Sequence, residues 1–174
     1  MKTLKVLFVC AGNTCRSPLA EALARREHGE GAVSFGSAGL QAVPGLPASE
    51  GSLVLAAEHG IDLSGHRSRP LTAPLLAGVD WVIVMTRGQA RGFRAAHPGY
   101  GGRLGLLGLP GVDLAASDPP PAAEEVNDPF GGDLAAYHAM GAQVERLLRG
   151  WRPVFEAAAA DRAGGAPPAP GEGS

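Results

Sequence analysis

Two cysteines, the only ones among 174 residues, lie in the stretch "VLFVCAGNTCRSP" as Cys10 and Cys15, with Arg16 directly after the second. Cysteine is nucleophilic as its thiolate, a form that cationic side chains and backbone N–H groups stabilise. A planar guanidinium binds two oxygens of one phosphate. These residue types therefore predict a phosphoryl group that is held beside Arg16 and attacked by Cys10.

The residues on either side of this stretch predict a strand, a tight loop and a helix. Residues 3–9 are apolar and β-branched, as in a buried strand, and "SPLAEALARREHG" (17–29) follows as a helix with Pro18 in its first turn. With Gly12 in the loop, backbone N–H groups can converge on one point at the positive end of that helix. Such a loop supplies a nucleophile, an anion site and charge stabilisation together. Ser17 is equally well suited to cap the helix.

Hydrolysis of a phosphorylated cysteine also needs a proton donor for the leaving group. An aspartate on a loop would serve, and the chemistry alone does not choose among Asp62, Asp113, Asp118 and Asp128. Asp128 precedes a proline, which is also a common signal for a turn.

The rest of the chain alternates between strand and helix patterns. It predicts strands at 32–39, 79–85 and 103–109 and helices at 47–60, 72–78 and 87–99. From Asp133 a last helix, which Pro153 ends or kinks, has one apolar face: Leu134, Tyr137, Met140, Val144, Leu147, Leu148 and Trp151. We expect one doubly wound α/β domain, a four-stranded parallel sheet with helices on both faces. Ligands of such sheets bind beyond the carboxyl ends of the strands, where the first strand ends at Cys10.

Length and composition place this domain at residues 1–162, with a disordered Pro/Gly-rich tail at 163–174 and a proline-rich surface loop at 110–129. The net charge of −2 and the 5% aromatic content argue against nucleic acid as a partner. We expect no membrane segment and no metal or cofactor, because no apolar run is long enough and no further cysteine exists. The sequence favours a cytoplasmic monomer with reduced thiols.

The stretch "CAGNTCRSP" (10–18) resembles the Cys-x-Gly-Asn-x-Cys-Arg-Ser-Pro loop of the low-molecular-weight protein tyrosine phosphatase family. The resemblance covers roughly residues 4–150. Further landmarks of the family follow in the same order: "SAG" at 37–39, "DLSGHRSRPL" at 62–71, "VIVMT" at 82–86 and "DPFGG" at 128–132.

This resemblance implies roles for individual residues. Cys10 is the nucleophile, Arg16 binds the phosphoryl oxygens, and Asp128 is the general acid and then the base that activates water. Ser17 resembles the serine that donates a hydrogen bond to the nucleophile. Asn13 resembles the asparagine that locks the loop, with support from Ser37 and His66. The residues implied to contact the phosphate or the substrate are Ala11, Gly12, Asn13, Thr14, Cys15, Ser17 and Phe130. Cys15 is also implied as the partner of Cys10 in a reversible, protective disulfide.

Two positions bear on which phosphorylated protein side chain is the substrate. Thr14 stands where the tyrosine-specific members usually carry a bulky apolar residue, and Phe130 stands where they usually carry tyrosine. Both choices resemble the bacterial protein arginine phosphatases of the family. For Thr14 there is a physical account: its hydroxyl can bond to a water or a guanidinium nitrogen near the P–N bond, and a site with a polar group to satisfy discriminates strongly. We expect phosphoarginine, with phosphotyrosine as the alternative. An arsenate reductase, which would need further cysteines, and a non-catalytic phosphate-binding module are less favoured.

Overall fold

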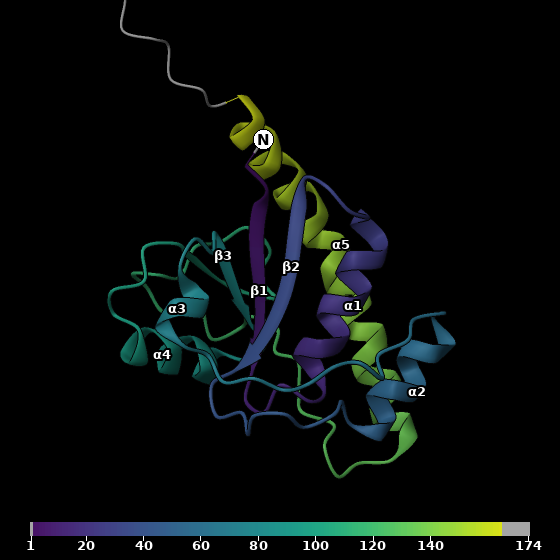
Figure 1. Ribbon diagram of the computed structural model, residues 1–174. Helices are drawn as coiled ribbons and strands as arrows, with labels where there is room; N and C mark the ends of the chain where they lie inside the picture. Colours follow the sequence, from purple (N-terminus) through teal and green to yellow (C-terminus); the bar gives the residue numbers. More distant parts are fainter. Residues whose placement is uncertain (1, 165–174) are drawn as a thin grey trace, which may run out of the picture.

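The computed structural model describes residues 2–164, in which four parallel strands form one sheet (Figure 1). The strands are β1 (Leu4–Cys10), β2 (Val33–Gly39), β3 (Trp81–Val84) and β4 (Arg103–Leu106), in the spatial order β2-β1-β3-β4. β1 therefore lies inside the sheet and pairs with both β2 and β3. The predicted four-stranded parallel sheet is confirmed.

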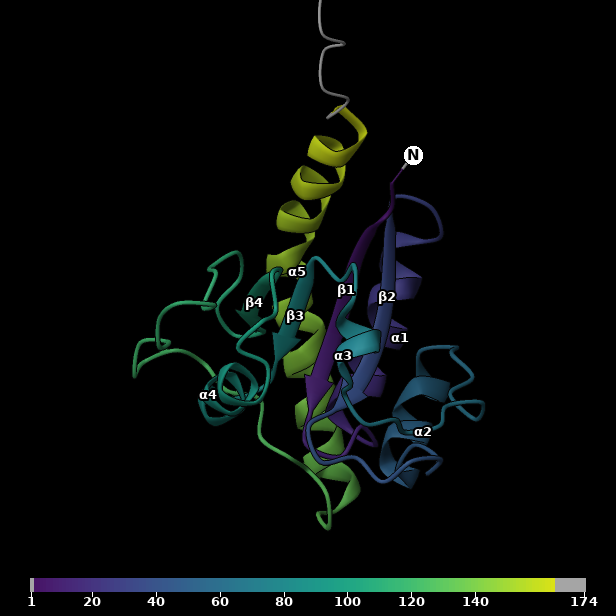
Figure 2. The same cartoon turned by 60° about the vertical axis from the view of Figure 1, so that its left-hand side comes forward.

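Helices cover both faces of this sheet, as the alternating pattern predicts (Figures 1 and 2). On one side lie α1 (Arg16–His28) and α5 (Leu134–Gly164), and α2 (Glu50–Glu58) packs against these two. On the other side lie α3 (Ala73–Leu76) and α4 (Arg87–Ala96). The sheet is thus enclosed between two apolar cores, and its two inner strands, β1 and β3, read as nearly continuous apolar runs.

Alternation along β1 sets the direction of the cysteine at its end. Val6 and Phe8 belong to the core beneath α1 and α5, whereas Leu7 and Val9 belong to the core beneath α3 and α4. Cys10 continues the first set, because side chains two residues apart share one face of a strand. The strand therefore places the sulfur on the side where α1 begins.

The last helix continues through Pro153 to Gly164, so of the two predicted alternatives, an end or a kink at this proline, the end is wrong. Trp151 and Phe155, on either side of the proline, are fully buried, and the Trp151 indole N–H donates to Leu107 O at 2.9 Å. Burying a large apolar side chain is worth about 1.5–3 kcal/mol. Two such rings offset the roughly 3 kcal/mol that an internal proline costs. Residues 163 and 164 of the predicted tail are helical, and 165–174 lie outside the described residues.

Two further expectations need correction. The proline-rich stretch 110–129 is not wholly a surface loop, because Leu114 and Val126 are buried in the two cores. Leu134, expected on the apolar face of the last helix, is exposed at its first position. Apolar periodicity places the middle of a helix against the core more reliably than its end, which projects beyond the sheet here.

Candidate active site

The loop between β1 and α1 has its carbonyl groups turned outward. Five of them accept hydrogen bonds from neighbouring segments: Cys10 O from Leu40 N, Ala11 O from Gln41 N, Asn13 O from His66 Nε2, Thr14 O from Ser49 N and Cys15 O from Ser52 Oγ, at 2.7–3.2 Å. Within a trans peptide unit the N–H points opposite to the C=O. The N–H groups of the loop are therefore directed inward, as an anion-binding site requires.

Close packing against the end of β2 fixes this loop. A side chain at Gly39 would bring its Cβ within 2.6 Å of Ala11 O and 3.0 Å of Asn13 N, so only glycine fits there. Asn13 itself has a φ of 56°, in the left-handed region that asparagine tolerates better than most residues.

The side chain of Asn13 joins three parts of the site. Its Nδ2 donates to Ser17 Oγ at 2.9 Å, and its Oδ1 accepts from the backbone N–H of Arg69 at 3.0 Å. His66 Nε2 lies 2.7 Å from the Asn13 carbonyl and must carry the hydrogen, because a carbonyl only accepts. Arg69 was missed by sequence reasoning, since a contact through its backbone leaves no side-chain signal.

Ser37, expected to support Asn13, makes a different contact. Its hydroxyl donates to Glu21 Oε2 at 2.6 Å, and no hydrogen bond joins it to Asn13 within residues 2–164. The Ser37 carbonyl accepts from Arg69 Nε at 2.8 Å. Ser37 thus reaches Asn13 only through Arg69.

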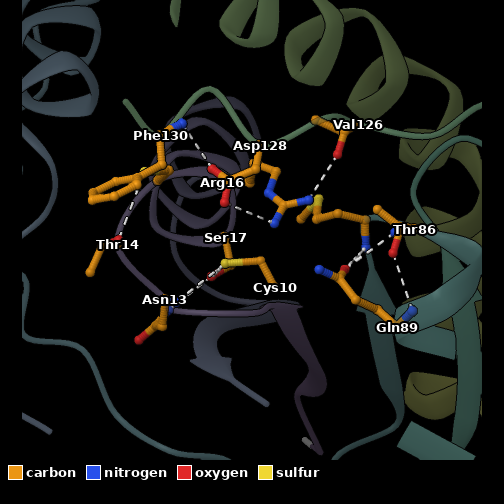
Figure 3. A network of polar contacts seen from close by, with 12 residues as sticks. Cys10, Asn13, Thr14, Arg16, Ser17, Thr86, Gln89, Val126, Asp128 and Phe130 are labelled. Atoms are coloured by element: carbon orange, nitrogen blue, oxygen red, sulfur yellow. Dashed lines mark hydrogen bonds and ion pairs between the residues drawn. The ribbon is translucent and has the colours of Figure 1, made fainter. Parts of the chain in front are cut away.

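The sulfur of Cys10 is buried and has two polar neighbours (Figure 3). Ser17 Oγ lies 3.0 Å from it, and the N–H of Asn13 donates to it at 3.3 Å. Both groups can donate a hydrogen bond to the sulfur. Ser17 is inside the first turn of α1, and Cys15 occupies the N-cap position, so the predicted cap role of Ser17 is wrong.

The side chain of Arg16 is only 5% exposed, and its guanidinium faces the segment that contains Val126 and Asp128 (Figure 3). Its NH1 donates to the carbonyl of Val126 at 2.9 Å, and its NH2 is 3.6 Å from Asp128 Oδ2. Its Nε is buried and has no hydrogen-bond partner in the described part of the chain. The hydrogen bond from NH1 to Val126 thus orients the plane of the guanidinium, and Nε remains as a donor for an oxyanion.

Asp128 is the one of the four candidate aspartates that lies beside Arg16, and 48% of its side chain is exposed. Its Oδ1 accepts from the N–H of Phe130 at 3.0 Å, which leaves Oδ2 at the mouth of the site. The other three are engaged elsewhere: Asp62 with Ser64 N, Asp113 with Leu104 N and Ala115 N, and Asp118 with Arg94.

Thr14 and Phe130 are both accessible near the phosphate loop. The Phe130 ring is the most exposed large apolar side chain of residues 2–164, at 74%. Thr14 is half-buried, and the only polar contact of its hydroxyl among these residues is Cys15 Sγ at 3.8 Å. Its hydroxyl therefore retains capacity for a further hydrogen bond.

Cys15 lies in a polar environment that sequence reasoning missed. Its Sγ donates to Ser49 Oγ at 3.2 Å and lies 3.5 Å from the Tyr137 hydroxyl. Burial raises the pKa of Tyr137, a shift that the hydrogen bond with Ser49 partly opposes. Neither cysteine forms a disulfide. Ser49 is the N-cap residue of α2 and Tyr137 belongs to α5, and no local pattern predicts that these two helices pack together.

Between residues 2 and 164, no group of three or more His, Cys, Asp or Glu side chains is arranged to hold a metal ion. Over the same range, every helix is too short or too polar to cross a bilayer.

Comparison with known proteins places this geometry in context. Residues 5–162 match the family model for low molecular weight phosphotyrosine protein phosphatase. The chain is 35% identical over 152 residues to the probable low molecular weight protein-tyrosine-phosphatase EpsP of Ralstonia solanacearum, which covers 87% of this chain and 96% of the relative. The corresponding enzyme Wzb of Escherichia coli K12 is 31% identical over 152 residues, covering 87% and 95%. The YwlE arginine phosphatase from Geobacillus stearothermophilus superposes with a TM-score of 0.76 at 29% identity, covering 94% of this chain and 98% of that one.

Proposed function

The chain belongs to the low molecular weight phosphotyrosine protein phosphatase family, whose members are hydrolases, and we propose that it dephosphorylates proteins through a phosphocysteine formed on Cys10. One observation carries the proposal. The Cys10 sulfur accepts a hydrogen bond from the N–H of Asn13 and lies 3.0 Å from Ser17 Oγ, inside an inward-facing amide loop whose guanidinium lies 3.6 Å from the carboxylate of Asp128.

In the first step the Cys10 thiolate attacks phosphorus and an S–P bond forms. The bond from phosphorus to the leaving nitrogen or oxygen breaks, and Asp128 gives its proton to that atom. Arg16 and the loop N–H groups bind the equatorial oxygens, where charge develops in the transition state.

In the second step Asp128, now ionised, takes a proton from water, and the water oxygen attacks phosphorus. The S–P bond breaks, inorganic phosphate leaves, and the thiolate re-forms. Ser17, 3.0 Å from the sulfur, stabilises the departing thiolate by donating a hydrogen bond. Asn13 holds the Ser17 hydroxyl in place from the other side.

For the substrate we propose phosphoarginine. The Thr14 hydroxyl, with spare capacity for a hydrogen bond, is placed to contact a guanidinium nitrogen, and the exposed Phe130 ring offers a flat face for stacking. Similarity to the YwlE arginine phosphatase supports this choice. The names of the EpsP and Wzb relatives support phosphotyrosine as the second candidate, because Phe130 would stack on a phenyl ring equally well.

Replacing Thr14 tests this choice. We expect Thr14→Ile to lower kcat/KM for a phosphoarginine protein relative to a phosphotyrosine protein by at least about tenfold, because an unpaired polar group in the site is penalised strongly. Thr72→Val, at the start of α3, is the matched control and should leave the ratio unchanged. A ratio that Thr14→Ile does not move would remove the case for arginine and favour tyrosine.

We also propose that Cys10 and Cys15 form a reversible disulfide under oxidising conditions, which would protect the nucleophile and stop catalysis. The presence of two buried thiols within one loop supports this proposal. Arsenate reduction is less favoured, because the sequence has no third cysteine to pass the disulfide on.

A further inference from the structure

The segment before Asp128 carries a glutamate, Glu125, that the chemistry above does not use. Its Oε1 accepts two hydrogen bonds from one residue of α4: from the backbone N–H of Arg87 at 3.0 Å and from the Arg87 side-chain Nε at 2.8 Å. The Arg87 guanidinium also donates to the carbonyl of Pro121. Arg87, the first residue of α4, therefore holds the chain that leads to Asp128 at two points, Pro121 and Glu125.

The residue after this glutamate connects the contact to the active site. Val126 is fully buried, and its N–H donates to Met85 O at 2.9 Å. Its carbonyl accepts from Arg16 NH1 at 2.9 Å, and Asp128 follows two residues later. Any displacement of the segment would therefore move the partner of the phosphate-binding guanidinium and the carboxylate beside it together.

Electrostatics favour a charged carboxylate at this place. Glu125 lies at the N-terminus of α4, where the helix dipole stabilises anions. The hydrogen bond from the Arg87 backbone N–H lowers the pKa of Glu125, with smaller contributions in the same direction from the Arg87 side chain and from Arg91, so this carboxyl is ionised in neutral solution.

We propose that the Arg87–Glu125 pair is a positioning device for the acid segment, residues 123–128, which sets the place of Asp128 relative to the phosphate loop. The pair does not contact the reacting atoms and acts through Val126. The inference rests on the proposed role of Asp128 as general acid. Misplacing a reacting group by about 1 Å can cost on the order of 100-fold in rate, so a partial displacement should be measurable.

The leaving group supplies the readout. Phenyl phosphate, with a weakly acidic phenol, needs a proton from the enzyme more than 4-nitrophenyl phosphate does. We expect Glu125→Ala to lower kcat/KM for phenyl phosphate by about tenfold and for 4-nitrophenyl phosphate by less than about threefold. Glu125→Gln keeps an acceptor oxygen and should recover part of the loss. The double variant with Arg87→Gln should lose less than the sum of the two single losses, since the contact of Arg87 Nε with Glu125 is common to both and only the contact with Pro121 adds to it.

Two references make the outcome decisive. Glu27→Gln removes a similar half-exposed pair, with Arg152, far from the segment, and should leave both substrates unaffected. Asp128→Asn should show the leaving-group dependence in full. If it does and neither Glu125→Ala nor Arg87→Gln does, the positioning role is wrong and the proposed function stands. If Asp128→Asn shows no such dependence, the acid assignment itself is wrong. Thermal unfolding shows whether each variant is folded. If either Glu125→Ala or Arg87→Gln fails to fold, the kinetics of the other variant test the positioning role.

Discussion

The phosphate loop, residues 10–17, and the acid segment, residues 123–128, meet at one site but are held there by different kinds of contact. The loop continues directly from the central strand, and buried hydrogen bonds fix its backbone on the outer side. The acid segment joins the site 110 residues later in the chain, where Val126 meets Arg16. Besides the buried hydrogen bonds of Val126, ion pairs that are roughly a third to a half exposed anchor it to α4 and α5.

This difference has a consequence for how each half responds to its surroundings. Buried hydrogen bonds between neutral groups are little affected by salt, whereas salt weakens partly exposed ion pairs. We therefore expect the half that holds the nucleophile to be the more rigid one and the half that holds the acid to respond more to its surroundings. Asp128, half exposed at the end of the segment, lies where such adjustment matters most.

The largest effect should come from the rigid half. Cys10→Ser should lower hydrolysis by roughly 10⁴-fold or more, because a serine hydroxyl in this loop has no base to activate it. The contacts of Asn13 with Ser17 and with Arg69 do not involve the sulfur, so the loop should keep its shape and still bind inorganic phosphate. Steady-state kinetics and isothermal titration with phosphate measure the two properties. Hydrolysis at the wild-type rate would contradict the nucleophile assignment.

The same contrast explains what could be predicted from the sequence. Cys10, Arg16 and Ser17 lie within one short stretch of the chain, between a strand pattern and a helix pattern. These local patterns were therefore enough to indicate an anion site. Asp128 could not be separated from three other aspartates by chemistry, because its place depends on contacts of Val126 with distant segments. Only the resemblance of "DPFGG" to a family landmark singled it out.

Contacts made through tertiary packing left no such signal. Arg69 binds Asn13 through its backbone, and Ser49 and Tyr137 approach Cys15 only because α2 and α5 pack together. The same limit applies to the fold. Pro153 reads locally as the end of a helix, but burial of the aromatic rings beside it keeps the helix intact.

An intermediate effect should follow from disturbing the rigid half without touching its chemistry. Gly39→Ala places a Cβ 2.6 Å from Ala11 O, and the backbone must move to relieve the clash. We expect a loss of about 1–3 kcal/mol in the free energy of unfolding and a weaker affinity for phosphate. Gly92→Ala, in α4 with open space around it, is the matched control and should stabilise the protein by about 0.5–1 kcal/mol. Denaturant unfolding followed by circular dichroism measures both. An unchanged stability for Gly39→Ala would mean that the loop is less constrained than its contacts indicate.

The smallest effect should come from the outer anchor of the acid segment, where Glu124 pairs with Arg146 of α5. The hydrogen bond from Arg146 lowers the pKa of Glu124 in the folded protein. The pair therefore stabilises the fold fully above the ordinary glutamate pKa of about 4.3, and this stabilisation is lost as the pH falls from there through the lowered pKa. Because the pair is exposed, Glu124→Gln should cost only about 0.2–1 kcal/mol at pH 7, less in high salt, and nothing at a pH well below the lowered value. Denaturant unfolding at two pH values and two salt concentrations checks this. A large loss that salt does not reduce would show that the acid segment is as rigidly held as the phosphate loop, and the contrast between the two halves would then be wrong.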